Sequence, residues 1–307
     1  MAHTVFIDGG AGTTGLEIGD RLAGRSEFDL VTLDDTRRKD PAARREALNE
    51  ADFVILCLPD EAAREAVGMI ENNRVRVIDA SSAHRVAPGW TFGFPEVVGR
   101  EAVAGAARVS NPGCYSTGFI ALLAPLVRSQ LLPADWPYGC SAVSGYSGGG
   151  KSLIARYGED GDIAWRTYAL DLAHKHVPEM QEICGLAVRP LFSPAVIPAY
   201  RGMATEVPLP LAAMPGASGP DRLRDCLAAF YEGGPVVRMG AAAEGELLLR
   251  CSAAPSDALE LYVFASNDGS QARLVATLDN LGKGASGAAV QSLNLMAGLD
   301  ETAGLRL

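Results

Sequence analysis

The part of the chain that ends at Asp79 alternates short apolar runs with segments that are apolar at helical spacing. Apolar residues predominate in these runs, including at consecutive positions, which is typical of strands buried on both faces of a parallel sheet. Because alternating strands and helices form βαβ units, we predict an α/β fold with an N-terminal Rossmann-type, doubly wound domain. The predicted strands are Thr4–Ile7, Phe28–Leu33, Phe53–Leu58 and Val75–Asp79, and the predicted helices are Thr14–Ala23 and Glu61–Ile70.

The pattern changes near Asn111, where prolines begin to interrupt the strand candidates. This pattern predicts a second, α+β domain. Its strand candidates are Ala195–Pro198, Thr205–Pro208, Glu246–Cys251 and Leu259–Ala265. The last apolar segment, Gly287–Met296, is helical again, and we expect it to return to the first domain. The first domain then comprises residues 1–113 plus 284–307, and the second comprises residues 114–283.

Composition narrows the classes of partner. Apolar residues make up 48% of the chain, charged residues 21%, and the formal net charge is −10. A negative balance argues against nucleic-acid binding, which needs clustered cations. No apolar run reaches the ~18 residues of a membrane span, and no leader pattern precedes the first strand, so we expect a cytoplasmic protein without a membrane partner. Six cysteines lack the paired spacing of a zinc site, so we expect no metal.

The segment Gly9–Gly15 follows a predicted strand and opens a predicted helix. Glycines allow the backbone to approach a pyrophosphate, and the N–H groups at the helix start favour an anion. The sequence therefore predicts a dinucleotide-binding loop. A tight turn without a ligand is the alternative.

A charge run, Asp34–Lys39, follows the second predicted strand, where the ribose of an adenosine would lie. An acidic residue there suits the 2′-hydroxyl of NAD, whereas arginines suit the 2′-phosphate of NADP. Three consecutive cations, Arg37, Arg38 and Lys39, favour NADP. A solvated charge run without a ligand fits the sequence equally well.

Cys114 differs from the other cysteines because the apolar run Phe119–Leu123 follows it at helical spacing. This places Cys114 at or near a helix N-terminus, which stabilises a thiolate and lowers the thiol pKa. We predict that Cys114 is a nucleophile, with a core cysteine as the alternative. Two of the four histidines, His174 and His176, provide a candidate base, because a distant histidine commonly moves the proton in cysteine acyl chemistry. His-x-His is also a possible metal pair, but no third clustered ligand accompanies it.

Two polar segments lie at predicted turns: Asp79–Arg85, which follows a predicted strand, and Ser144–Lys151. An arginine can hold a phosphate through two hydrogen bonds, and glycine-rich turns expose N–H groups. Either segment alone indicates only a loop, and their weight comes from the motifs around them.

Together these motifs resemble the short form of the N-acetyl-gamma-glutamyl-phosphate reductases, within the wider family that includes aspartate-semialdehyde dehydrogenase. The resemblance covers nearly the whole chain, and its most specific elements are Asn111–Tyr115 and His174–Glu179. The other matching segments are Gly9–Gly15, Leu58–Asp60, Ser81–Arg85, Gly93–Glu96, Ser144–Lys151, Arg201–Gly202 and Asp279–Gly284. Where longer relatives read Ser-Ala-Asp-Phe-Arg, this chain reads Ser82-Ala83-His84-Arg85, which keeps the arginine but changes its surroundings.

The resemblance implies site residues by position. The nucleophile falls on Cys114 and the acid/base histidine on His176. Substrate-binding positions are implied at Arg85, Asn111 and Arg201. With the glycine loop and the charge run, the cofactor-binding positions are expected at Gly9, Gly12, Thr13, Thr14, Gly15, Arg37, Arg38, Pro59, Ser82, Ser147, Gly148 and Asn280.

The implied reaction is the NADPH-dependent reduction of N-acetyl-L-glutamyl 5-phosphate to the 5-semialdehyde, a step of arginine biosynthesis. Cys114 attacks the acyl phosphate, hydride reduces the resulting thioester, and the thiohemiacetal collapses while His176 handles the protons. The first domain would bind NADP, and the second would carry catalysis and the contacts of a homo-oligomer, a dimer or tetramer. The alternatives are an aspartate-semialdehyde dehydrogenase and a non-catalytic dinucleotide-binding sensor.

Overall fold

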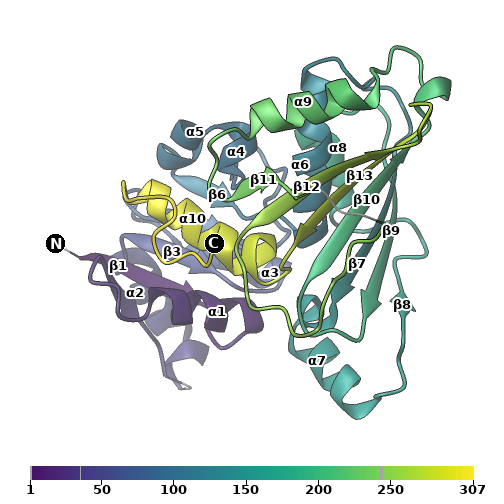
Figure 1. Ribbon diagram of the computed structural model, residues 1–307. Helices are drawn as coiled ribbons and strands as arrows, with labels where there is room; N and C mark the ends of the chain where they lie inside the picture. The colour runs from purple at the N-terminus through teal and green to yellow at the C-terminus, as the bar shows by residue number, and fades with distance from the viewer. Residues whose placement is uncertain (1, 35, 242–244) are drawn as a thin grey trace. The chain divides into compact units, whose positions relative to one another are not determined.

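A computed structural model of the protein describes residues 2–34, 36–241 and 245–307, which form two compact units. Unit 1 comprises Met1–Pro112 and Ala285–Leu305, and unit 2 comprises Gly113–Gly284 with Arg306–Leu307. Each unit has its own sheet (Figure 1). Among the described residues, no helix has both the length and the apolar character that a bilayer crossing requires.

The sheet of unit 1 has six parallel strands in the order β2-β1-β3-β4-β6-β5. The α/β, doubly wound class predicted for the N-terminal part is confirmed. Its strands are β1 (His3–Asp8), β2 (Phe28–Val31), β3 (Phe53–Leu56), β4 (Arg76–Asp79), β5 (Thr91–Phe92) and β6 (Arg108–Ser110). Its helices are α1 (Thr13–Leu22), η1 (Arg37–Lys39), α2 (Pro41–Glu50), α3 (Asp60–Met69), α4 (Pro95–Val98), α5 (Arg100–Ala104) and α10 (Gly287–Met296).

Side-chain alternation explains why consecutive residues of these strands are apolar. Val5 and Ile55 point into a core with residues of α1, α5 and α10, whereas Phe6, Val54 and Leu56 point into a second core with residues of α2 and α3. Both faces of the sheet are therefore covered, as a parallel sheet requires. The segment predicted to return at the C-terminus is α10, whose Ala289, Val290 and Leu293 belong to the first of these cores.

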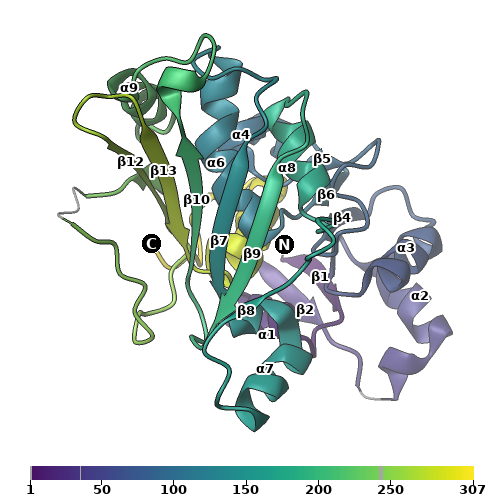
Figure 2. The same cartoon turned by 90° about the vertical axis from the view of Figure 1, so that its right-hand side faces the viewer.

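Unit 2 has a seven-stranded mixed sheet in the order β11-β12-β13-β10-β7-β9-β8. Figure 2 shows β12, β13, β10, β7 and β9 side by side in this order. The strands are β7 (Gly139–Gly145), β8 (Arg166–Thr167), β9 (Leu191–Ile197), β10 (Met203–Leu209), β11 (Val237–Met239), β12 (Leu259–Ala265) and β13 (Ala272–Leu278). The helices are α6 (Cys114–Arg128), η2 (Tyr146–Gly149), α7 (Gly150–Glu159), α8 (Val177–Cys184), η3 (Leu211–Ala213) and α9 (Pro220–Phe230), and the π-helical turn η4 (Gly282–Ser286) follows β13.

One face of this sheet packs on α6, which in turn contacts α8 and α9. Met203, Thr205 and Val207 are fully buried, whereas the alternate positions of β10 are more exposed. Gly118 allows α6 to approach closely, because a Cβ there would lie 2.7 Å from the Thr205 hydroxyl oxygen. The opposite face of the sheet carries the partly exposed residues of the same strands.

The strand predictions for unit 2 have mixed outcomes. Leu259–Ala265 is β12, Thr205–Pro208 falls within β10, and Ala195–Pro198 overlaps the last residues of β9. The prediction for Glu246–Cys251 was wrong, because this segment has no regular structure and pairs with no strand. An apolar run of that length does not distinguish a paired strand from a segment that lies over a sheet.

Candidate active site

Cys114 is the first residue of α6, and Gly113 is the N-cap. The Gly113 carbonyl oxygen accepts three hydrogen bonds: from the Thr117 N–H at 2.9 Å, the Ser116 hydroxyl at 2.8 Å and the Thr117 hydroxyl at 2.9 Å. Residues 115–127 are buried, so the helix is fixed along its length. The predicted position of Cys114 at a helix N-terminus is therefore observed, and this environment favours a thiolate.

The turn before Cys114 is held from the other side by α8. The Gly113 N–H donates to the carboxylate of Glu179 at 3.1 Å, and Glu179 is only 1% exposed. Glu179 lies in the first turn of α8, and His176 is the N-cap of the same helix. The starts of α6 and α8 therefore meet, which brings Cys114 and His176 into one site.

The two histidines form one hydrogen-bonded group with Tyr168. The His176 N–H donates to Nδ1 of His174 at 3.1 Å, and Nε2 of His174 lies 3.2 Å from the Tyr168 hydroxyl. Since Nδ1 of His174 accepts, the neutral ring carries its proton on Nε2 and donates to Tyr168. Burial raises the pKa of Tyr168 to about 12, so its hydroxyl stays protonated. His174 thus fixes the backbone of His176.

Aromatic rings enclose the histidines. The Tyr115 ring centroid lies 5.8 Å from that of His176 and 6.0 Å from that of His174, and Phe192 lies 5.1 Å from His174. The two imidazoles are 4.5 Å apart at an interplanar angle of 80°. His176 is 5% exposed, so its surroundings are those of a shielded proton carrier.

The loop after β13 lies against Cys114. A Cβ on Gly284 would stand 2.9 Å from the Cβ of Cys114, so only glycine fits at this position. Earlier in the same loop, the amide of Asn280 donates to the Ser147 hydroxyl at 2.9 Å and accepts from the Gly202 N–H at 2.9 Å. Gly284 is therefore in contact with Cys114, and Asn280 of the same loop is joined to Ser147.

Two further predicted residues lie at the same loop. An added Cβ on Gly148 would come within 3.4 Å of the Asn280 amide nitrogen. Arg201 forms an ion pair with the carboxylate of Asp279 at 2.9 Å. Arg201 thus already has an anionic partner in the protein, which leaves its predicted contact with the substrate as a hypothesis.

Three of the other cysteines are poor nucleophiles. Burial, with a smaller contribution from Asp79 and Asp8, raises the pKa of Cys57 to about 12. Burial also raises the pKa values of Cys140 and Cys184 above the ordinary range of a thiol. These three residues are neutral thiols at physiological pH, whereas Cys114 is the first residue of a helix.

The glycine loop of unit 1 connects β1 to α1 as predicted. Gly9 has a φ of +87°, and a Cβ there would lie 2.3 Å from the Cys57 carbonyl oxygen. A Cβ on Gly15 would lie 2.7 Å from the Gly10 Cα, so helix and loop are in close contact. The N-cap, Gly12, has no side-chain cap, and the first turn of α1, which includes Thr13 and Thr14, contains no acidic residue. The turn therefore suits a pyrophosphate.

Strand order indicates where a dinucleotide would lie in unit 1. The order reverses between β1 and β3, and such switch points are where α/β sheets bind ligands. The glycine loop follows β1, and Pro59, the N-cap of α3, follows β3. The predicted cofactor residues in these two loops thus flank the switch point.

The charge run lies beyond β2, at the same sheet edge as the glycine loop, because β1 and β2 are parallel. Arg37 is exposed and pairs with Glu46 at 3.1 Å, and Arg38 is also exposed. The Asp34 carboxylate accepts the Arg37 and Thr36 N–H groups, which lower its pKa. Asp35 lies outside the described residues. The run contains both an acid and arginines, so its geometry does not distinguish NAD from NADP.

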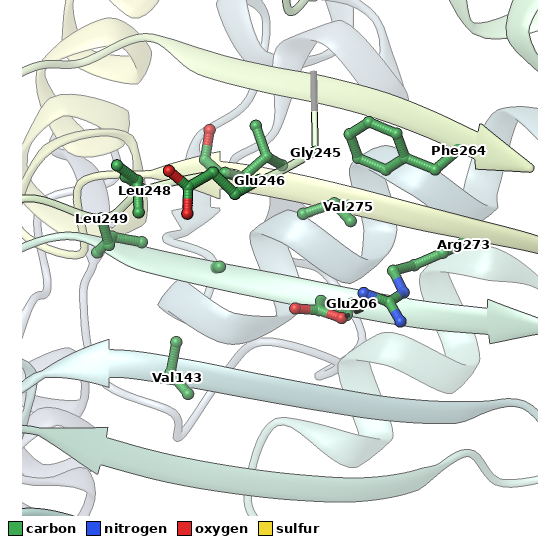
Figure 3. A pocket seen from close by; sticks show the side chains of 12 residues that line it. Val143, Glu206, Gly245, Glu246, Leu248, Leu249, Phe264, Arg273 and Val275 are labelled. Carbon is green, nitrogen blue, oxygen red and sulfur yellow. Dashed lines mark ion pairs between the residues drawn. The ribbon is translucent and has the colours of Figure 1, made fainter. Parts of the chain in front are cut away.

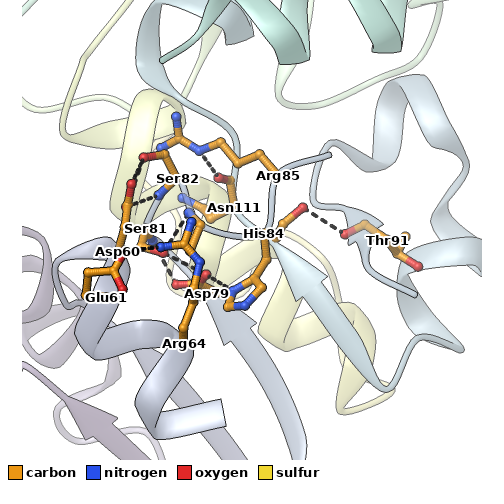
Figure 4. A network of polar contacts seen from close by, with 12 residues as sticks. Asp60, Glu61, Arg64, Asp79, Ser81, Ser82, His84, Arg85, Thr91 and Asn111 are labelled. Atoms are coloured by element: carbon orange, nitrogen blue, oxygen red, sulfur yellow. Dashed lines mark hydrogen bonds and ion pairs between the residues drawn. The ribbon is translucent and has the colours of Figure 1, made fainter. Parts of the chain in front are cut away.

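The predicted residues Ser82, Arg85 and Asn111 belong to one polar network of unit 1 (Figure 4). Ser82 is held by Asp60, and Arg85 donates from Nε to the Asn111 carbonyl oxygen at 3.1 Å. The Asn111 amide donates to the Ala285 carbonyl oxygen, while its own side-chain oxygen is buried and has no protein partner among the described residues. A buried acceptor of this kind suits a ligand donor.

Sequence reasoning missed several residues that shape these sites. Glu179 and Gly284 lie in matched motifs but had no assigned role, and the resemblance assigned a role to His176 but none to His174. Lys283 is 1% exposed and lies in the π-helical turn next to Gly284, the kind of irregularity often found at functional sites. Motif membership was the only signal in the sequence for all four. Across the described ranges, no group of three or more His, Cys, Asp or Glu side chains is arranged to hold a metal ion.

Two family models of known proteins match this chain, one in unit 1 and one in unit 2. Residues 4–106 match the NAD-binding domain of semialdehyde dehydrogenases, and residues 114–280 match their dimerisation domain. N-acetyl-gamma-glutamyl-phosphate reductase 2 of Pseudomonas putida is 51% identical over 96% of this chain and 98% of that protein. The reductases of Burkholderia ambifaria and Trichormus variabilis are 50% and 45% identical, over at least 96% of both chains.

Solved structures show the same fold at low identity. Aspartate semialdehyde dehydrogenase II of Vibrio cholerae has a TM-score of 0.71 at 18% identity, covering 97% of this chain and 99% of that chain. A probable aspartate-semialdehyde dehydrogenase of Pseudomonas aeruginosa has a TM-score of 0.72 at 16% identity, over 96% and 98% of the two chains. At these identities the likeness extends to the fold and no further.

Proposed function

The chain belongs to the N-acetyl-gamma-glutamyl-phosphate reductases, and from this membership we propose a covalent mechanism centred on Cys114. The protein is an oxidoreductase that reduces N-acetyl-L-glutamyl 5-phosphate to the 5-semialdehyde and releases phosphate, in arginine biosynthesis. The observation that carries the mechanism is that the N-termini of α6 and α8 meet. Cys114 is the first residue of α6, and His176 is the N-cap of α8.

In this mechanism, His176 takes the proton of the Cys114 thiol. The sulfur then bonds to the acyl carbon, the carbon–oxygen bond to phosphate breaks, and a thioester remains on Cys114. When bound, the reduced nicotinamide supplies the hydride that reduces the acyl carbon. His176 returns its proton to the sulfur as the carbon–sulfur bond breaks and the aldehyde leaves. His174 and Tyr168 keep His176 in place throughout.

The cofactor is a nicotinamide dinucleotide, as the NAD-binding domain match indicates. We assign it to unit 1, with the pyrophosphate at the N-terminus of α1. NADP rather than NAD is our proposal, supported by the exposed Arg37 and Arg38 beyond β2. Unit 2 would supply catalysis, and a cytoplasmic location remains part of the proposal.

We also propose that unit 2 mediates homo-oligomerisation through the sheet face opposite α6. The matched model for this unit is a dimerisation domain. The face contains a hollow of about 490 Å³ whose lining includes Val143, Phe264 and Leu248 (Figure 3). Replacing Val143 and Phe264 together by Glu should reduce the mass measured by light scattering. An unchanged mass would place the contact elsewhere.

A spectrophotometric assay in the reverse direction tests the function. NADP reduction should occur with N-acetylglutamate semialdehyde and should require phosphate, because phosphate must cleave the thioester. Faster turnover of aspartate semialdehyde would favour that family instead. No turnover with either aldehyde, despite dinucleotide binding, would favour a non-catalytic sensor.

A further inference from the structure

The loop Ser81–Arg85 of unit 1 is anchored to two acidic residues. Asp60 accepts the Ser82 N–H at 2.9 Å and the Ser82 hydroxyl at 2.7 Å. Asp79 accepts the Ser81 N–H at 2.9 Å and the Ser81 hydroxyl at 2.8 Å, and it also binds His84. Figure 4 shows both carboxylates on the same side of the loop.

The Asp79–His84 pair is short and shielded. Nδ1 of His84 lies 2.6 Å from Asp79, whose side chain is 0% exposed, and the His84 side chain is 12% exposed. The Trp90 ring stacks on His84 at 4.2 Å and 11°, because turns at Ala87 and at Gly89, with a φ of +80°, bring the chain back. Since a carboxylate only accepts, Nδ1 of His84 carries a proton. The imidazole is therefore fixed in position, orientation and tautomer.

These contacts continue to Arg85 through a closed ring. The Asp79 carbonyl oxygen accepts the Asn111 N–H at 2.7 Å, and Arg85 donates to the Asn111 carbonyl oxygen at 3.1 Å. Asp79 thus holds Asn111 through its backbone and His84 through its side chain. Because His84 and Arg85 are adjacent, a shift of the imidazole must move the base of the arginine side chain.

We propose that His84, held by Asp79, is a positioning residue that sets Arg85 for the acyl-phosphate substrate. The inference rests on the proposed function and on the substrate-binding role that the resemblance implies for Arg85. His84 itself touches neither substrate nor cofactor in this assignment. Its loss should therefore weaken recognition of the substrate but not binding of the dinucleotide.

Two amide substitutions distinguish the effect of the hydrogen bond to Asp79 from the effect of side-chain volume. In His84→Asn the amide nitrogen lies near the place of Nδ1 and can still donate to Asp79, whereas in His84→Gln it lies near the place of Nε2. We expect His84→Gln to raise the KM for the semialdehyde about 10-fold or more, with kcat and the KM for NADP nearly unchanged, because small displacements of positioning groups are costly. His84→Asn should restore most of the loss.

A double-mutant cycle tests whether His84 acts through Arg85. In the Arg85→Ala background, His84→Gln should have little further effect on the semialdehyde KM, whereas independent roles would give additive effects. His3→Gln is the matched control, since His3 forms an exposed pair with Asp52 at 3.9 Å in the same unit. Should His84→Gln be insoluble, Asp79→Asn takes its place, because it keeps the size of the side chain and removes the charge.

The outcomes are distinguishable. No turnover of N-acetylglutamate semialdehyde by the wild-type protein, or an unchanged KM in Arg85→Ala, would overturn the proposed role of the site itself. An active wild type whose KM rises in Arg85→Ala but not in His84→Gln would overturn the positioning role alone. Additive effects in the cycle, or equal effects of the Asn and Gln variants, would do the same.

Discussion

Helices α1 and α6 both begin after a glycine N-cap, and neither N-terminus is capped by a side chain. They differ in what surrounds the exposed N–H groups. At α1 the surroundings are backbone: Gly12 donates to the Gly9 carbonyl oxygen, and the Cys57 carbonyl oxygen lies against Gly9. At α6 they are side chains, the Glu179 carboxylate on one side and the thiol of Cys114 itself.

The difference shows how a helix N-terminus can serve two kinds of chemistry. A helix N-terminus attracts an anion wherever it occurs. A backbone cradle of glycines leaves room for a large anion such as a pyrophosphate. At α6 a carboxylate already accepts the preceding N–H, a cysteine occupies the first position, and histidines lie near. We therefore expect the stabilised anion there to be the Cys114 thiolate. Separate substitutions should therefore abolish one use and leave the other.

Replacing Cys114 by Ser should have the largest effect. Turnover should fall by on the order of 10⁵-fold or more, as expected when the nucleophile of a covalent enzyme is removed. No thioester should be detected by mass spectrometry, while NADPH binding, measured by fluorescence, should be nearly unchanged. A thioester trapped on another cysteine would refute the assignment, and a loss of dinucleotide binding would show that the two helix ends are not independent.

Replacing His176 by Asn should lower kcat by about 10²–10⁴-fold, the usual contribution of a general acid or base. His174→Asn should cost less, about 10-fold, since that ring acts on His176 through the backbone and Tyr168. Steady-state turnover of both variants decides the order. A larger loss at His174 would reverse the assignment of the proton carrier.

Replacing Gly9 by Ala should affect the other helix end. The added Cβ would stand 2.3 Å from the Cys57 carbonyl oxygen at a φ of +87°, so the loop must shift. We expect weaker dinucleotide binding and a free energy of unfolding lower by about 1–3 kcal/mol. Gly24→Ala is the control, because Gly24 has a φ of +75° but no atom within 4 Å of its Cβ position. Equal dinucleotide affinities in the two variants would contradict the proposal that the glycine loop before α1 binds the dinucleotide.

Neutralising Arg37 and Arg38 should affect the binding of one cofactor only. NADPH binding should weaken about 10- to 100-fold through lost charged hydrogen bonds, and NADH binding should hardly change. Arg45→Ala is the control, an exposed arginine on α2 whose partner is Glu71. Dissociation constants for both cofactors provide the measurement. An equal loss of affinity for NADPH and NADH would show that Arg37 and Arg38 do not bind the 2′-phosphate.

The sequence predicted unit 1 better than unit 2. Mainly apolar strands and helices with regular spacing made the parallel sheet recognisable, and in unit 2 the strand β12 was also predicted. The strands β7 and β13 were missed, although both lie near the centre of the unit 2 sheet. Glycine, serine and alanine form much of β7, and such a run carries little hydrophobic pattern.

The sequence by itself determined the features that depend on neighbouring residues along the chain. The glycine loop before α1 and the cysteine at the start of α6 both follow from a strand, a turn and a helix in succession. Their chemistry is a property of a helix end, which local sequence specifies.

Only the tertiary structure decided which distant side chains complete each site. Glu179 contacts Gly113, which is 66 positions away in the sequence. Gly284, which follows β13, lies against Cys114. His174 was revealed as a support of His176, and Asp79 as the partner of His84. The physical reason is that hydrogen bonds and close packing depend on distance in space, and the sequence gives spacing only along the chain.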